Sequence, residues 1–153
     1  MRVYTQKQDS TCFIVAMANC YSYLGLKQDR NFQNHISDLK QECKGGPFLR
    51  KQQGIKELGL DKYLNETDHA TDLQVTGGIV SIMHPVFNLH ACFVSKVDLK
   101  DCLVYNSWLG PSGTRMSWRE LFRFCRHTSS THWYFKYAPS LNLPTIKQQE
   151  DMA

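Results

Sequence analysis

Hydrophobic and polar residues follow two different periods along the chain, and the change falls near residue 78. In the first half, apolar side chains recur every three or four residues, which is the period of an amphipathic helix. This pattern predicts helices over residues 12–24, 31–44 and 47–58. The first of them runs through the apolar stretch Phe13–Ala18, so we expect it to be the central, buried helix of the fold.

Residues with known roles at helix ends mark these boundaries. Ser10 or Thr11 can cap the first helix, because a short hydroxyl side chain accepts a hydrogen bond from an N-terminal amide. Gly25 is placed to end it. Residues 61–77 are polar and irregular, with short extended pieces such as Leu73–Val75, and are expected to form the loop between the two halves.

Beyond residue 78 the pattern becomes that of strands separated by turns. It predicts one helix, over residues 117–126, and strands over 79–83, 91–97, 103–105 and 132–137. The turn Asp98–Asp101 is short, which implies an antiparallel hairpin. A helical half followed by an antiparallel sheet predicts an α+β domain.

Length and composition favour one soluble domain. The chain has 153 residues, a usual size for a single domain, and we expect the domain over residues 1–138 and a flexible tail over 139–153. Hydrophobic residues make up 42% and charged residues 21%, with no 18-residue apolar run, so no membrane span is expected. The first residues lack the apolar core of a secretory signal, which predicts a cytoplasmic protein.

Charge and cysteine content give no sign of a nucleic-acid or cofactor site. The net charge is only +4, the cations are mixed with acids, and no nucleic-acid-binding motif accompanies them. Six cysteines at irregular spacing predict free thiols in a reducing compartment rather than a disulfide framework. Cys92 and Cys102 with the histidines leave a diffuse zinc site as the alternative to the expected absence of any metal or cofactor.

The candidate chemistry begins at Cys12, which opens the predicted central helix. The dipole and the unpaired amides of a helix N-terminus favour a thiolate over a thiol. A histidine beside the sulfur would accept its proton, and an amide on the far side of the ring would fix the orientation of the imidazole. Downstream, Leu89-His90-Ala91 and Asn106-Ser107-Trp108 supply both side chains.

With Gln6 six residues before Cys12, these motifs resemble papain-like cysteine peptidases, and more closely their small C39-like, bacteriocin-processing branch. The resemblance extends over residues 3–137. It implies a nucleophile helix packed on a C-terminal antiparallel sheet. It also implies that Gln6 supplies the oxyanion hole, Cys12 the nucleophile, His90 the general base and acid, and Asn106 the group that orients the histidine.

The sequence departs from both patterns near the cysteine. Papain-like signatures have Gly two residues before the nucleophile and Trp or Tyr after it, where this chain has Ser10 and Phe13. C39 peptidases usually carry Asp before the cysteine and Asp as the orienting residue, where this chain has Thr11 and Asn106. The resemblance therefore defines the superfamily more firmly than the branch.

Each candidate has an alternative. His84 is the rival base and Gln8 the rival oxyanion donor, while Cys12 could be a buried structural thiol and Asn106 a turn residue. In the family, the Trp after the orienting residue shields its bond to histidine from water, and Trp108 stands there. Trp108 could equally be a core residue, as we expect for Trp118 and Trp133.

The resulting hypothesis is a monomeric thiol hydrolase that cleaves a peptide or isopeptide bond in a peptide or protein substrate. An acyl transferase would use the same triad, because the reactions differ in who supplies the second nucleophile. A non-catalytic protein-binding module on the same fold, such as an inhibitor or host-directed effector, is the alternative from another class. Neither a nucleic-acid nor a membrane partner is expected.

Overall fold

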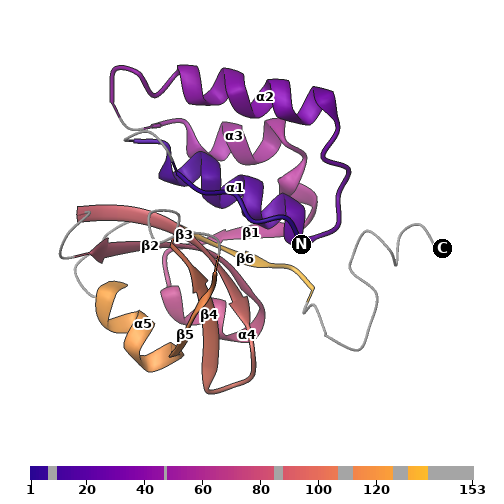
Figure 1. The fold of residues 1–153 in the computed structure, drawn as a ribbon. Helices are drawn as coiled ribbons and strands as arrows, with labels where there is room; N and C mark the ends of the chain where they lie inside the picture. Colours follow the sequence, from indigo (N-terminus) through magenta and orange to yellow (C-terminus); the bar gives the residue numbers. More distant parts are fainter. Residues whose placement is uncertain (7–9, 47, 85–87, 107–111, 126–130, 138–153) are drawn as a thin grey trace.

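The structure is a computed structural model, and it describes residues 1–6, 10–46, 48–84, 88–106, 112–125 and 131–137. A six-stranded sheet lies between two groups of helices: α1, α2 and α3 cover one face, and α4 and α5 the other (Figure 1). This is the predicted α+β class, with the helical first half packed on an antiparallel sheet. The predicted tail, residues 139–153, lies outside the described residues.

The first face carries the three predicted helices. They are α1 (Cys12–Tyr23), α2 (Arg30–Gln41) and α3 (Lys51–Glu57). The third begins later than predicted, at Lys51, because Phe48 instead packs its ring against Phe13, with ring centroids 6.1 Å apart. Asp29 caps α2 by accepting a hydrogen bond from the Phe32 amide at 3.0 Å.

Helix α1 is the buried central helix that its apolar sequence predicts. From Phe13 to Cys20 every residue is buried, and α1 packs on strands β2 and β3. Its last residue, Tyr23, lies 5.1 Å from Phe93 of β3 between ring centroids. Burial of several large apolar side chains on one helix, at roughly 1.5 to 3 kcal/mol each, fixes α1 firmly against the sheet.

The strands form one antiparallel sheet in the order β1-β6-β2-β3-β4-β5. They are β1 (Leu64–Thr67), β2 (Gly77–His84), β3 (Asn88–Lys96), β4 (Asp101–Tyr105), β5 (Thr114–Ser117) and β6 (His132–Phe135). The β3–β4 hairpin around the turn Asp98–Asp101 is confirmed. Asp98 Oδ1 stabilises that turn by accepting hydrogen bonds from the amides of Lys100 and Asp101.

The prediction of a loop over residues 61–77 is wrong. This segment contains β1, and Leu73–Thr76 form the short helix α4 rather than an extended piece. Leu64 pairs with Phe135 at the other end of the chain, and both side chains enter the same core. A pairing between residues so far apart leaves no local signal, and the same holds for edge strand β5, which precedes the predicted C-terminal helix.

The second face of the sheet has its own core. Helix α5 (Trp118–Cys125) buries Trp118, Leu121 and Cys125 against β2, β3 and β4. The Trp118 indole donates to the Asp98 carbonyl at 3.0 Å, which ties the start of α5 to the β3–β4 turn. Trp118 and Trp133 are both core residues, as predicted.

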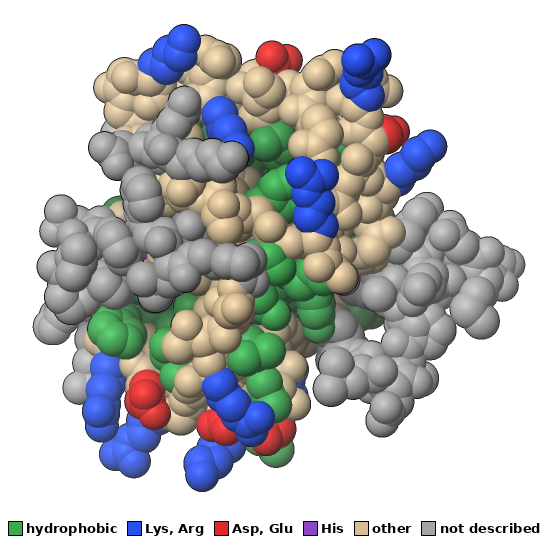
Figure 2. Space-filling view, in the orientation of Figure 1, with side chains coloured by type: hydrophobic (Ala, Val, Ile, Leu, Met, Phe, Trp, Pro, Cys, Tyr) green, Lys and Arg blue, Asp and Glu red, His purple; other side chains and the backbone are tan. Residues whose placement is uncertain are grey.

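The visible surface carries no single block of charge. Lys and Arg side chains are spread over the upper, helical part of the view and lie among Asp and Glu side chains at its lower margin, while hydrophobic side chains gather between the helical layer and the sheet (Figure 2). Among the helices that the structure describes, none is long and apolar enough to cross a membrane.

The start of β2 generates a prediction about stability. Gly78 has φ +150°, and a Cβ on it would lie 1.9 Å from the Trp133 carbonyl oxygen. We expect Gly78→Ala to lower the free energy of unfolding by about 2 kcal/mol or more in urea titrations. Gly45→Ala is the matched control, because nothing lies within 4 Å of its Cβ position, and should change stability by less than about 0.5 kcal/mol. Equal effects of the two substitutions would contradict this packing.

Candidate active site

Cys12 is the first residue of α1, where the sequence predicted a nucleophile. Thr11 holds the N-cap position, although its side chain makes no capping hydrogen bond. Of the six cysteines, all free, Cys12 alone is partly exposed and the other five are buried. Burial raises the pKa of Cys102 and of Cys125 to about 12, so these two thiols stay protonated and unreactive at neutral pH.

Ser10 occupies an unusual backbone conformation directly before the helix. Its φ is +67°, and among the described residues it is the one non-glycine residue with positive φ. A left-handed conformation costs a residue with a Cβ roughly 1 to 2 kcal/mol, whereas glycine adopts it freely. Papain-like signatures carry glycine at this position. Ser10 therefore departs from the signature in residue type but has the backbone conformation that glycine favours.

The segment that carries Gln6 is fixed to α1 by the two polar side chains buried in that helix. Asn19 Oδ1 accepts from the Tyr4 amide at 2.6 Å, and Asn19 Nδ2 donates to the Tyr4 carbonyl at 3.1 Å. Ser22 Oγ donates to the Arg2 carbonyl. Gln6, itself buried at 8% exposure, follows two residues after Tyr4. The helix that begins at Cys12 thus also holds the segment leading to the predicted oxyanion donor.

His90 and Asn106 form a buried hydrogen-bonded pair. His90 Nε2 lies 3.1 Å from Asn106 Oδ1, and the two residues are 2% and 6% exposed. Because the amide oxygen can only accept, Nε2 carries the proton, and Nδ1 is then the basic nitrogen of the neutral ring. This is the orientation that the predicted roles of the two residues require.

The β3–β4 hairpin explains how residues 16 apart meet. Phe93 pairs with Tyr105, so continuing the register sets Asn106 opposite Cys92. His90 is two residues from Cys92 and shares its face of β3. Diagonal neighbours of this kind are within reach of long side chains. The sequence therefore contained the signal for this contact, in the short turn and the strand period.

Cys12 also lies near this part of β3. Burial raises the pKa of the Cys92 thiol, and a thiolate at Cys12 would raise it further. Helix α1 packs on β3, and in Figure 1 the first turn of α1 and the first residues of β3 lie on the same side of the molecule. Helix α1 therefore starts at the end of the sheet where β3 begins, and His90 is the third residue of that strand.

The side chains of the rival candidates lie outside the described residues. His84 ends β2, and its side chain lies outside the described residues, as do Gln8 and Trp108. In the described part of the chain, no three His, Cys, Asp or Glu side chains gather closely enough to hold a metal ion.

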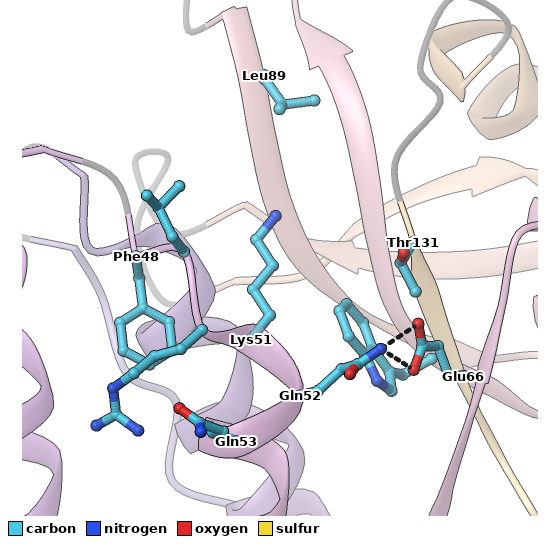
Figure 3. A pocket seen from close by; sticks show the side chains of 10 residues that line it. Phe48, Lys51, Gln52, Gln53, Glu66, Leu89 and Thr131 are labelled. Carbon is cyan, nitrogen blue, oxygen red and sulfur yellow. Dashed lines mark hydrogen bonds between the residues drawn. The ribbon is translucent and has the colours of Figure 1, made fainter.

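A groove of about 640 Å³ lies where the start of α3 meets strands β1, β3 and β6, and Gln6, Cys12, His90 and Asn106 are not among its lining residues. It is lined by residues 48–53 at the start of α3, by Glu66 of β1, Leu89 of β3, and Thr131 and Trp133 at β6 (Figure 3). Leu89 precedes His90 in β3, so the two side chains lie on opposite faces of the strand and only the backbone of His90 is close to the groove. Phe13, which follows Cys12, contacts the lining residue Trp133 with ring centroids 5.1 Å apart. The lining comes from four distant segments, so no local motif could reveal it.

The buried helix that begins at Cys12 and the antiparallel sheet on which it packs form a C39-like, papain-like fold. The peptidase domain of Streptococcus ComA, described as a bi-functional ABC transporter involved in a quorum-sensing pathway, is similar in structure, with a TM-score of 0.61. The match covers 91% of this chain and 98% of that domain at 15% identity, which shows a shared fold. No protein-family model matches the chain, and no curated protein matches its sequence.

The strained backbone before Cys12 can be tested by substitution. Ser10→Gly relieves the left-handed conformation but adds backbone entropy to the unfolded chain, so we expect a net gain of about 0.5 to 1 kcal/mol in the free energy of unfolding. Ser10→Val should lose about 1 to 2 kcal/mol, because a β-branched residue tolerates positive φ poorly. Urea titrations in which Ser10→Gly is the less stable of the two would contradict the conformation.

Proposed function

We propose that this protein is a cysteine peptidase that hydrolyses a peptide or isopeptide bond through Cys12, His90 and Asn106, with Gln6 in the oxyanion hole. The observation that carries the proposal is the buried bond between His90 Nε2 and Asn106 Oδ1. A bond shielded from water orients the imidazole more strongly than an exposed one. The ComA domain supports the proposal as a peptidase domain of the same fold.

The reaction proceeds in two halves. Cys12 gives its thiol proton to His90 Nδ1, and its Sγ attacks the carbonyl carbon, while the oxyanion is held by the Cys12 amide and the Gln6 side chain. The C–N bond breaks as His90 gives its proton to the leaving amine, which leaves a thioester on Cys12. Water then attacks the thioester and gives a proton to His90. The C–S bond breaks to release the acid, and His90 returns the proton to Cys12 Sγ, which restores the thiol.

Asn106 acts by holding the ring, with Nδ1 as the basic nitrogen. While Nε2 donates to Asn106 Oδ1, the imidazole cannot turn, and the imidazolium formed during catalysis keeps a hydrogen-bond acceptor. C39 peptidases usually place an aspartate here. A carboxylate also accepts from Nε2–H, so either residue satisfies this role.

Turnover of a peptide mixture tests the proposal. A proteome-derived peptide library, analysed by mass spectrometry, should yield new termini with the wild-type protein and none with Cys12→Ala. We expect His90→Ala to lower kcat/KM about 10² to 10⁴-fold, because the general base is lost. Gln6→Ala should lower it about 10² to 10³-fold, because one oxyanion donor is lost.

Two further variants separate orientation from folding. Asn106→Asp should retain activity, whereas Asn106→Leu, which offers no acceptor, should lose most of it. His69→Ala, at an exposed histidine, should match wild type. The proposal is wrong if the wild type cleaves nothing, or if cleavage survives Cys12→Ala. Transfer of the acyl group to an added amine in preference to water would instead indicate an acyl transferase.

A further inference from the structure

Two leucines in the lining of the groove are open to solvent. Leu49 is 87% exposed and Leu89 48% exposed, and both line the groove. Phe48 and Trp133, which also line the groove, are nearly fully buried. Exposed leucines in a lining that also contains aromatic side chains provide a surface that a large apolar side chain would cover.

The charged side chains that line the groove differ in whether they already pair with a neighbouring side chain. Arg50 donates to both Glu42 and Glu57 at 2.6 to 2.7 Å, so its charge is neutralised by two carboxylates. Glu66 accepts from Gln52 Nε2 at 2.6 and 2.7 Å. Among the residues that the structure describes, Lys51 forms no ion pair, and its ammonium contacts the Phe13 ring at 5.5 Å.

Lys51 is also the groove charge placed closest to the candidate chemistry. Its contact Phe13 follows Cys12, and its side chain extends from α3 toward Leu89, which precedes His90 (Figure 3). Glu66 lies toward Thr131, at the other side of the view, with its carboxylate turned to Gln52. A peptide held for attack by Cys12 would thus meet the apolar end and Lys51 first.

We infer that this groove binds an extended substrate segment carrying a large apolar residue and an acidic residue close to the scissile bond, with Lys51 as the residue that selects the acid. This inference rests on the proposed function for its link to cleavage, but its recognition chemistry is independent of turnover. The apolar side chain covers Leu49 and Leu89, and the substrate carboxylate pairs with the Lys51 ammonium. A carboxylate is favoured over a cation at this end of the groove, because Lys51 forms no ion pair among the described residues, whereas Glu66 lies toward Thr131 and its carboxylate is turned to Gln52.

Binding to the inactive protein tests the inference without any need for cleavage. Cys12→Ala is used to select from a displayed library of random peptides, and the selected peptides are sequenced. We expect enrichment of a large apolar residue together with Asp or Glu. Adding Lys51→Glu should reverse the preference to Lys or Arg, and Lys51→Met should weaken binding of a selected acidic peptide by about fivefold, the upper range for one partly exposed ion pair.

Matched controls make each outcome decisive. Lys56→Glu makes the same charge change on an exposed residue of α3 that does not line the groove, and should leave the preference unchanged. The inference is overturned if no peptide is enriched, if basic peptides are preferred, or if Lys56→Glu acts as strongly as Lys51→Glu.

The same peptides separate this inference from the proposed function. Acidic, apolar peptides that bind but are not cut by the wild-type protein would leave the groove assignment intact and contradict the peptidase. Cleavage by the wild-type protein with no preference for an acidic residue would support the peptidase and contradict the groove assignment.

Discussion

The burial of helix α1 is the constraint on which the rest of the structure depends. Its apolar residues place the helix against β2 and β3, and this fixes where its first residue, Cys12, can lie. Two polar residues inside the same helix, Asn19 and Ser22, bind the backbone of the N-terminal segment. One buried element therefore sets the position of the candidate nucleophile and of the chain that leads to Gln6.

The sheet supplies the complementary half by an equally local device. A short turn joins β3 to β4, and the resulting register brings His90 and Asn106 together inside the protein, where an unpaired polar group would be costly. Each of these side chains satisfies the other, so the fold gains from the same bond that orients the imidazole. Ser10 has the opposite effect on stability, because its strained backbone, directly before the candidate nucleophile, costs the fold free energy.

The sequence allowed prediction of what local patterns encode. The spacing of apolar residues predicts the helix that begins at Cys12. The short turn predicts the β3–β4 hairpin, and the hairpin brings His90 close to Asn106. Strand β1 and the residues that line the groove around Lys51 could not be predicted from the sequence, because both depend on contacts between distant segments. Leu64 of β1 pairs with Phe135, and the groove forms where the start of α3 meets β3 and β6. The segment Leu73–Val75 was predicted to be extended, yet it lies within helix α4, where Leu73 joins the second core.

The central claim is that His90 activates the sulfur of Cys12, and the rate of alkylation of Cys12 by iodoacetamide across pH 5 to 9 tests it most directly. Mass spectrometry of the native protein reads each thiol separately, with the buried Cys102 and Cys125 as internal references. We expect Cys12 alone to react at pH 6, and His90→Gln to shift its profile toward that of an ordinary thiol, which ionises near pH 8.5. A Cys12 that reacts no faster than the buried thiols, or whose profile is unchanged by His90→Gln, would contradict the account.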